Sequence, residues 1–495
     1  MMATHKRLRA ALLFVFGIVL GSALTLLFAK NPALLTGKPS LDGTLAGAVP
    51  EREKTVTLKA PVGFQRLLEA YQVIESNYYD PEAADASKLI DGAIRGMVDA
   101  LGDPYTSYMD PEELKEFQTS LSSSFEGIGT EVTMQNNRLT VVSPFKDSPA
   151  EKAGIRPNDQ IISVDGQSIE GLSLHEAVKK IRGPKGSKVE LGILRNGLSE
   201  PITITVIRDK IPLESVYSSR FQKDGHTIGR LQITSFSENT DERFKAALKN
   251  LQAEGIEGLI IDVRGNPGGY LGAVDHILNT ILPNGKIMYQ IEYRDGRREV
   301  AKSNGQGLGI PVVVLIDEGS ASASEILAAG LKDAGFPIVG TKSFGKGTVQ
   351  VPKDLSSGGT LKLTTAKWLA PDGSWIHKVG VTPTVEVQEP AYFHLPPLAV
   401  EKPLGRDTND KTIALMQQML KALGFDPKRT DGYFDATTEQ ALRAFQSKEG
   451  LLTTGKLDDQ TAQALNNSLV QKIKNPDNDR QLEKALQTVL KALQK

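Results

Sequence analysis

The sequence predicts a multidomain α/β protein: an N-terminal membrane anchor and helical segment, a β-rich domain, an α/β core with a largely parallel sheet, and a C-terminal all-α module. The spacing of apolar residues supports this order. It is helical before residue 121, alternates as in short strands up to 209, and then switches between strands and helices up to 388. At about 150 residues per domain, 495 residues suffice for three or four domains.

Charge and cysteine content exclude several classes of protein. The chain has 58 Lys and Arg against 59 Asp and Glu, a net charge of -1, so no electrostatic attraction to nucleic acid is expected. It has no cysteine, which excludes disulfides, thiolate metal ligands and a cysteine nucleophile. A nucleophile in this protein must therefore be an oxygen or a nitrogen.

The N-terminus predicts a membrane anchor within residues 1–30. Lys6, Arg7 and Arg9 precede an uncharged, mostly apolar run over 10–29, which is long enough to span a bilayer. Basic residues before the run place the N-terminus in the cytoplasm and the rest of the chain outside. The alternative is a cleaved signal peptide, but its apolar region is usually shorter and precedes a small-residue cleavage site. We therefore expect a single-pass protein of the cell membrane with the chain after residue 30 on the extracytoplasmic side.

A tether and a helical domain follow. Residues 31–60 are rich in Pro, Gly, Thr and Lys without a sustained period, which is typical of a tether. Within 61–120, apolar residues recur at three- and four-residue spacings from Phe64 to Leu101, so we expect helices that end at the Gly-Asp-Pro sequence 102–104.

Residues 121–209 are predicted to form a β-rich domain. The strand-like runs are LTVV (139–142), QIISV (160–164), KVELGIL (188–194) and ITITVI (202–207), with short helices near 148–154 and 173–181. Within this domain, SSFEGIGTEV and SPAEKAGIRPNDQIISVDG resemble PDZ domains, which capture the C-termini of proteins. The alternative is another small β-barrel.

The PDZ resemblance implies a peptide site. A peptide would add as a strand to the sheet edge, while backbone N–H groups of a glycine-containing loop receive its terminal carboxylate. The residues implied for the loop are Phe125, Glu126, Gly127, Ile128 and Gly129, and those implied for the helix that lines the groove are Leu174 and Val178.

Residues 210–388 alternate between apolar strands and helices. The expected order is LQITSF, a helix over 242–251, GLIIDV, a helix over 271–282, PVVVLID, a helix over 324–333, and FPIVG. Continuous apolar strands separated by helices indicate a parallel sheet that is buried on both faces. This region is the candidate catalytic domain.

The C-terminal part is predicted to be helical after a proline-containing linker over 389–408. Residues 409–470 contain LMQQMLKALGF, DGYFDATTEQALRAFQSKEGL and the echo LDDQTAQAL, and they resemble the small helical peptidoglycan-binding domains of wall-associated enzymes. The alternative is an unrelated helical bundle. Within 471–495, one helical face carries Leu482, Leu486, Val489 and Leu493, which predicts packing on a neighbouring element.

Three loops follow predicted strands of the core: RGNPGG (264–269), EGSASASEI (318–326) and TKSFGKGTVQ (341–350). Loops after parallel strands gather at the carboxyl edge of a sheet, so we expect one site built from all three. The serine loop places hydroxyls at the positive end of a helix, where a serine is either an N-cap or a nucleophile. The candidates are Ser320, Ser322 and Ser324.

A serine nucleophile needs a base. None of the 6 histidines lies in these loops, so a Ser-His-Asp triad is poorly supported. Lys346 is the remaining base, provided that burial or cationic neighbours lower its pKa. If GTVQ continues as a strand, Gln350 lies on the same side as Lys346 and can hold the amine by an uncharged hydrogen bond. The glycines of RGNPGG would let backbone N–H groups approach a reacting oxygen.

The lysine loop also comes close to a nucleotide-binding loop, which is one rival interpretation. Gly340, Gly345 and Lys346 fit the pattern G-x-x-x-x-G-K-[ST], but Gly347 stands where the pattern has the hydroxyl that holds magnesium.

Four segments together resemble the carboxyl-terminal processing proteases, the tail-specific serine peptidases of family S41 with a Ser-Lys dyad. They are GLIIDVRGNPGG, EGSASASEILAAGLKDAG, VGTKSFGKGTVQ and LTTAKWLAPDGSWIHKVGVTP. The resemblance implies that Ser322 is the nucleophile, Lys346 the general base and Gln350 the residue that positions the base. It implies an oxyanion hole made by the backbone N–H groups of Ala323 and Gly269.

The resemblance also implies regulation and assembly. Arg182 would be the arginine through which the PDZ domain takes part in switching, and the helical segments would form a homodimer. The predicted protein is thus a membrane-anchored, extracytoplasmic serine endopeptidase that recognises polypeptides by their free C-termini, holds to cell wall peptidoglycan, and uses no metal or nucleotide. The alternative is a non-catalytic PDZ scaffold tethered between membrane and cell wall.

Overall fold

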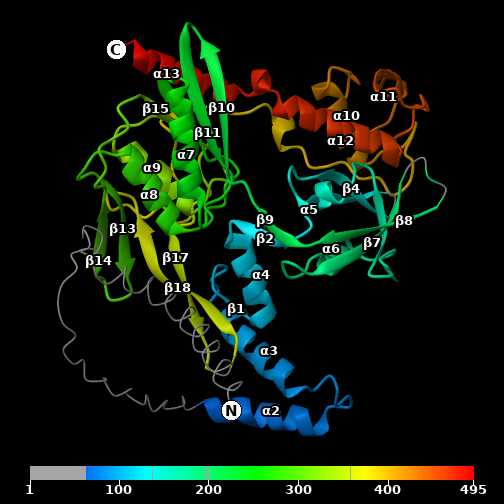
Figure 1. Ribbon diagram of the computed structural model, residues 1–495, viewed down its shortest axis with the longest axis horizontal. Helices are drawn as coiled ribbons and strands as arrows, with labels where there is room; N and C mark the ends of the chain where they lie inside the picture. Colours follow the sequence, from blue (N-terminus) through cyan, green and yellow to red (C-terminus); the bar gives the residue numbers. More distant parts are fainter. Residues whose placement is uncertain (1–62, 136–137, 196–197, 199, 357, 495) are drawn as a thin grey trace. The chain divides into compact units, whose positions relative to one another are not determined.

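The computed structural model describes residues 63–494, with gaps at 136–137, 196–197, 199 and 357 (Figure 1). By its contacts the chain forms two units, Met1–Pro81 and Glu82–Lys495. The described part of the first unit consists of helix α2 (Phe64–Asn77), none of whose residues is buried.

The predicted alternation of strands and helices in the core is confirmed by a six-stranded sheet of order β10-β11-β12-β15-β16-β19. Only β10 is antiparallel to its neighbour. The strands are β10 (Val216–Lys223), β11 (His226–Ile233), β12 (Gly258–Asp262), β15 (Val312–Ile316), β16 (Ile338–Gly340) and β19 (Val385–Glu386).

The two faces of this sheet are covered by different parts of the chain. On one face lie α7 (Thr240–Ala253), α8 (Leu271–Ile281) and α9 (Ala323–Asp333), which follow β11, β12 and β15 directly. The other face packs on α13 (Arg480–Leu493), near the end of the chain (Figure 1). The packing predicted for the C-terminal helix is therefore confirmed, because Leu482, Leu486 and Val489 are buried there.

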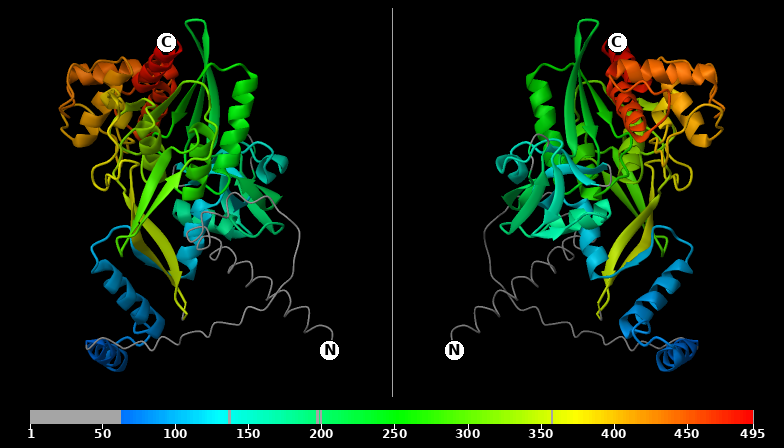
Figure 2. Two further views of the ribbon diagram at one scale, coloured as in Figure 1. Left: turned by 90° about the vertical axis from the view of Figure 1, so that its left-hand side faces the viewer. Right: turned by 90° about the vertical axis from the view of Figure 1, so that its right-hand side faces the viewer.

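A second sheet, of order β1-β18-β13-β14 with β17 paired to β18, was not foreseen in the sequence. Its strands are β1 (Ser107–Met109), β13 (Ile287–Tyr293), β14 (Arg298–Lys302), β17 (Thr348–Asp354) and β18 (Thr360–Leu369), the last two forming the long yellow hairpin of Figure 2. The strand expected over GTVQ is the start of β17. The short strand β1 lies between α3 (Ala86–Asp99) and α4 (Pro111–Leu121), so the helical segment before the β-rich domain also contributes to the core.

The β-rich domain has the sheet order β3-β4-β5-β7-β8, with β6 paired to β5. Its elements are β3 (Thr130–Gln135), β4 (Arg138–Pro144), α5 (Pro149–Lys152), β5 (Gln160–Val164), β6 (Gln167–Ser168), α6 (Leu174–Ile181), β7 (Lys188–Leu194) and β8 (Ile202–Ile207). The chain enters through β2 (Ser124–Gly127) and leaves through β9 (Asp209–Pro212), and these two strands pair antiparallel. The domain is thus an insertion whose two ends are joined.

The C-terminal module contains α10 (Lys411–Ala422), α11 (Ala436–Lys448) and α12 (Asp459–Lys474). The echo in its sequence has a structural basis, since Asp435 and Asp458 cap α11 and α12 by accepting hydrogen bonds of 2.8 Å from the backbone N–H groups of Thr438 and Thr461. The segment predicted as a linker is packed rather than free. Leu398 is buried, and its backbone N–H donates to Asn466.

The predicted membrane location needs correction. The expected span, residues 10–29, and the tether, 31–60, lie outside the described residues. Within residues 63–494, no helix has both the length and the apolar character that crossing a bilayer requires; α12, for example, has 16 residues and carries charged side chains. A span needs about 20 predominantly apolar residues. The assignment as a single-pass membrane protein is therefore withdrawn.

Candidate active site

The serine loop joins β15 to α9 and distinguishes its three serines by burial. Ser320 and Ser324 are fully buried, and their hydroxyls donate to the carbonyl oxygens of Val263 and Asn266, each at 2.8 Å. These two serines therefore fasten the loop. Ser322 is half-buried, precedes the first residue of α9 and has φ 53°, a backbone conformation that strains a non-glycine residue by roughly 1–3 kcal/mol.

The glycine loop after β12 lies against this serine. A Cβ on Gly268 would stand 2.9 Å from the Cβ of Ser322 and 3.0 Å from the backbone nitrogen of Ala323. A Cβ on Gly269, whose φ is 143°, would stand 2.1 Å from the carbonyl oxygen of Phe236. Both positions require glycine because backbone approaches backbone there. The predicted meeting of the serine and glycine loops is therefore present in the structure.

Lys346 lies in the loop that leads into β17, and its side chain is partly shielded from water. Its Nζ is 5.2 Å from the centre of the Tyr105 ring, and its carbonyl oxygen accepts a hydrogen bond of 2.7 Å from Trp368 Nε1. Burial, followed by the positive charge of Lys362, lowers the pKa of Lys346, against an opposing effect of nearby carboxylates. The lowered pKa favours the neutral amine that a general base requires.

One buried carboxylate, that of Glu325 in α9, connects the serine loop to the lysine loop. Its Oε2 accepts hydrogen bonds from the backbone N–H of Ser322, at 2.9 Å, and of Lys346, at 2.8 Å. Its Oε1 accepts from Gly345 N–H, at 2.7 Å, and from the Ser343 hydroxyl, at 2.6 Å. The backbone N–H groups of the two predicted catalytic residues, Ser322 and Lys346, are thus close in space, since both donate to the same oxygen atom.

Glu325 was missed in the sequence, although a signal for it was present. It stands three residues after Ser322, the spacing of the capping-box pattern S/T-x-x-E. The contacts of Tyr105 and Trp368 with Lys346 had no such signal, because these residues come from distant parts of the chain.

Gln350 lies in β17, and its Nε2 donates to Thr348 Oγ1, at 2.9 Å, and to Thr364 Oγ1, at 3.0 Å. The Thr364 hydroxyl in turn donates to Asp103 at 2.6 Å. Gln350 is therefore held by a polar chain next to the lysine loop, and its role in positioning Lys346 stays a prediction.

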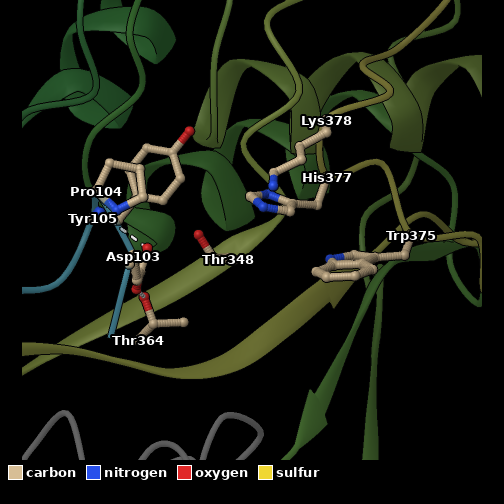
Figure 3. Close-up of a pocket in the computed structure, with 9 residues that line it drawn as sticks. Asp103, Pro104, Tyr105, Thr348, Thr364, Trp375, His377 and Lys378 are labelled. Carbon is tan, nitrogen blue, oxygen red and sulfur yellow. Dashed lines mark hydrogen bonds between the residues drawn. The ribbon is translucent and has the colours of Figure 1, made fainter. Parts of the chain in front are cut away.

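A cavity of about 240 Å³ opens beside Tyr105 (Figure 3). Three aromatic rings contribute to its walls. His377 stacks on Trp375, with 5.0 Å between ring centroids, and meets Tyr105 edge-on, with 6.1 Å between ring centroids. Burial, followed by the charge of Lys378, lowers the pKa of His377, which keeps this wall uncharged at neutral pH. The cavity therefore combines aromatic surface with the charged side chains of Asp103 and Lys378.

The residues predicted to receive a C-terminal carboxylate lie at the entrance of the β-rich domain. Phe125, Glu126 and Gly127 belong to β2, and Gly129 follows with φ 74°. The side chain of Ile128 is buried in the core of the domain, so only its backbone is available to a peptide.

The predicted groove residues lie on α6, and the predicted regulatory arginine lies at its C-terminal end. Leu174 is exposed and Val178 half-buried on α6. Arg182, which ends α6, places its guanidinium carbon 5.1 Å from the centre of the Phe125 ring. The structure thus brings a cation to the loop that is predicted to bind a carboxylate.

On a largely parallel sheet, the chain thus combines a strained serine, a glycine loop and a lysine of lowered pKa, the parts from which a serine hydrolase is built. Sequence profiles agree with it. Peptidase family S41 matches residues 227–387, a PDZ domain matches 140–195, a putative peptidoglycan binding domain matches 409–465, and the N-terminal domain of the activating protease CtpB matches 39–113.

Two relatives from Bacillus subtilis are similar over most of their length. The carboxy-terminal processing protease CtpB is 46% identical over 86% of this chain and 88% of the relative. The carboxy-terminal processing protease CtpA is 41% identical over 99% of this chain and 100% of the relative. A solved structure, the photosystem II D1 C-terminal processing protease, is 29% identical, with a TM-score of 0.41 over 66% of this chain and 94% of its own.

The chain therefore belongs to peptidase family S41 and is a serine peptidase of the carboxy-terminal processing type. It carries a PDZ domain and a peptidoglycan-binding-type domain, as its sequence predicted.

Proposed function

We propose that this enzyme is an endopeptidase with a Ser-Lys dyad, which recognises polypeptides by their free C-termini and cleaves them for processing or degradation. One observation carries the proposal. Glu325 Oε2 binds the backbone N–H groups of both Ser322 and Lys346, so a hydroxyl and an amine of lowered pKa emerge from adjacent points.

The residues support a two-step acyl transfer. The Ser322 hydroxyl attacks the scissile carbonyl carbon as Lys346 Nζ takes its proton. The backbone N–H groups of Ala323 and Gly269 stabilise the oxyanion. Lys346 then returns the proton to the leaving amine, which leaves an ester on Ser322. Water, deprotonated by Lys346, attacks this ester and releases a carboxylic acid product and free Ser322. Gln350 is proposed to keep Lys346 oriented.

The PDZ domain is proposed to select the substrate. The loop 125–129 receives the terminal carboxylate, and α6 borders the groove through Leu174 and Val178. Arg182 is proposed to take part in switching the enzyme, supported by its position over the Phe125 ring of that loop.

The remaining domains are proposed to hold the enzyme at the cell wall and to join two copies of it. Residues 409–470 would bind cell wall peptidoglycan, in keeping with the profile match over 409–465. A homodimer is proposed through the helical segments, because α2 leaves Phe64, Val73 and Ile74 exposed and a second copy would cover them. Multi-angle light scattering would show a monomer if the dimer is wrong.

We also propose the domain limits themselves: a helical domain at 61–120, the PDZ domain at 121–209, the protease core at 210–388 and the peptidoglycan-binding-type domain at 409–470.

The test is cleavage of an unfolded protein with a free or a blocked C-terminus, followed by mass spectrometry in buffer with chelator and without nucleotide. We expect Ser322→Ala and Lys346→Ala each to lose about 10⁴-fold in rate or more. Lys342→Ala, an exposed lysine of the same loop, is the control and should retain activity. Because burial lowers the pKa of Lys346, kcat/KM should reach its plateau below the ordinary pKa of lysine.

The outcomes separate the rival functions. A scaffold would bind C-terminal peptides and leave them uncut in the wild type as well as in Ser322→Ala. A nucleotide-dependent protein would be inactive in this buffer. Full activity of Lys346→Ala at neutral pH would exclude the dyad, and equal cleavage of blocked and free substrates would exclude recognition of the C-terminus.

A further inference from the structure

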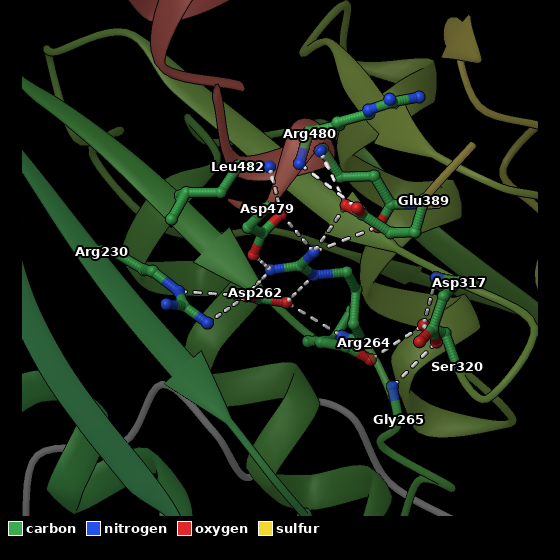
Figure 4. Close-up of polar contacts among 12 residues, drawn as sticks. Arg230, Asp262, Arg264, Gly265, Asp317, Ser320, Glu389, Asp479, Arg480 and Leu482 are labelled. Atoms are coloured by element: carbon green, nitrogen blue, oxygen red, sulfur yellow. Dashed lines mark hydrogen bonds and ion pairs between the residues drawn. The ribbon is translucent and has the colours of Figure 1, made fainter. Parts of the chain in front are cut away.

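A buried cluster of charges lies at the carboxyl end of β12 (Figure 4). Arg264 donates from Nε and Nη2 to the buried Asp262, at 2.9 and 2.8 Å, and from Nη1 and Nη2 to Asp479, at 2.9 and 2.7 Å. Arg230 binds Asp262 from the neighbouring strand at 2.6 Å. Burial opposes ionisation, but Arg264 and then Arg230 bring the pKa of Asp262 down to about 2. Arg264 is thus held on two sides by carboxylates.

Besides Asp262, two carboxylates near Arg264 come from the segments that flank the peptidoglycan-binding-type domain on either side. Glu389, at the start of the segment 389–408 that precedes that domain, lies 3.7 Å from Arg264 Nη1 and accepts a hydrogen bond of 2.8 Å from the backbone of Gln481. Asp479, just after the domain, also accepts from Leu482 N–H at 2.7 Å and so caps α13. The two segments that connect the domain to the protease core therefore each place a carboxylate next to the guanidinium of Arg264.

Arg264 is also the first residue of the glycine loop. The next residue, Gly265, donates its N–H to Asp317 at 2.8 Å, and Asp317 accepts from the Ser320 hydroxyl at 3.2 Å (Figure 4). Three residues further on, Gly268 lies against Ser322. A displacement of Arg264 would therefore move the loop that borders the nucleophile.

We propose that Asp479 and Glu389 are positioning residues, which act through Arg264 to hold the glycine loop in its catalytic geometry. The helical domain that they flank is thereby coupled to the active site. This proposal rests on the proposed function, in which the Gly269 N–H stabilises the oxyanion. An oxyanion donor displaced by even part of an ångström stabilises the transition state less, whereas binding of the substrate ground state is little changed.

The test compares two substitutions that each replace a carboxylate with an uncharged amide, one at the N-cap and one in the first turn of α13. Asp479→Asn keeps the size and the helix-capping oxygen but removes the charge that faces Arg264. Glu483→Gln, one turn later, removes an ion pair with Lys223 and has no contact with Arg264. We expect Asp479→Asn to lower kcat about tenfold with KM within about twofold, and Glu483→Gln to change neither by more than about twofold.

Hydrogen exchange provides a readout that does not depend on activity. In Asp479→Asn the amides of residues 264–269 should exchange faster, while those of β15 should not, and Glu483→Gln should resemble the wild type. The proposal is overturned if Asp479→Asn leaves both kcat and the exchange of this loop unchanged, or if both variants reduce kcat alike. An inactive wild type would instead refute the proposed function, and the exchange data would still decide whether Asp479 holds the loop.

Discussion

The two faces of the protease sheet are equally buried but are covered in different ways. On the first face, α7, α8 and α9 pack on strand residues such as Leu231, Leu259 and Val314. On the second face, α13 packs on the alternate residues, among them Ile260, Val313 and Leu315. The first cover comes from helices adjacent to the strands in sequence, and the second comes from beyond a whole inserted domain.

The topology explains this difference. The parallel strands follow one another in the sheet in chain order, from β11 to β12, β15 and β16. Right-handed crossovers repeated in one direction place every connecting helix on the same face. The second face is then left bare unless another segment covers it, and here α13 does so. The C-terminal segment is therefore part of the protease core rather than an appendage.

The largest expected effect tests whether α13 contributes as much to stability as the helices on the opposite face of the sheet. Leu482→Ala on α13 and Leu248→Ala on α7 each remove a buried leucine, and each should lower the free energy of unfolding by about 2–5 kcal/mol. Urea unfolding followed by tryptophan fluorescence measures both, because Trp368 and Trp375 lie in this domain. A loss below about 1 kcal/mol for Leu482→Ala alone would show that α13 is dispensable.

A second prediction concerns the fit of α13 to the sheet. A Cβ on Gly258, in β12, would stand 2.3 Å from Cγ1 of Val489, whose rotamer is restricted in a helix. Gly258→Ala should therefore destabilise the domain by about 1–3 kcal/mol. Combined with Val489→Ala, it should cost at least about 1 kcal/mol less than the sum of the two single changes. Strictly additive losses would contradict this close contact.

The smallest effect concerns charge on the two faces. On the second face the buried Asp262 is paired with arginines, whereas Asp275 on α8 is bonded by Tyr289 at 3.1 Å and lies beside His276 rather than an arginine. Burial raises the pKa of Asp275 to about 6. The folded state therefore binds this proton more tightly, and stability falls as pH rises from about 4 to 6.

Asp275→Asn should accordingly raise the free energy of unfolding by about 1–2 kcal/mol at pH 8, with the gain vanishing near pH 4. Thermal unfolding at the two pH values provides the comparison. A gain that is the same at both would rule out ionisation of Asp275 as its cause.

Much of the site was predictable because its parts stand next to strand ends. The apolar runs located β12, β15 and β16, and the loops after them carried Gly269, Ser322 and Lys346. The choice of Ser322 over Ser320 and Ser324 was available only through family resemblance. In the structure the same distinction follows from burial, because the two flanking hydroxyls are occupied by backbone carbonyls.

The second sheet was harder to predict, because its strands come from separate segments. β1 stands before the PDZ domain and β13 lies between α8 and β15, within the connection from β12 to β15, and neither has a local pattern that shows its partner. The positions of Tyr105 beside Lys346 and of Asp479 beside Arg264 follow from such long-range pairings.

The sequence by itself determined the parallel core, the three loops of the site and the family, since each depends on short-range apolar spacing or on contiguous motifs. Only the tertiary structure decided that Glu325 joins the serine and lysine loops, that α13 covers the second face, and that Arg264 receives carboxylates from both ends of an inserted domain. The physical reason is that a side chain's burial and partners depend on packing between segments that are far apart in the chain, and the local pattern within one segment does not show which distant segment it meets.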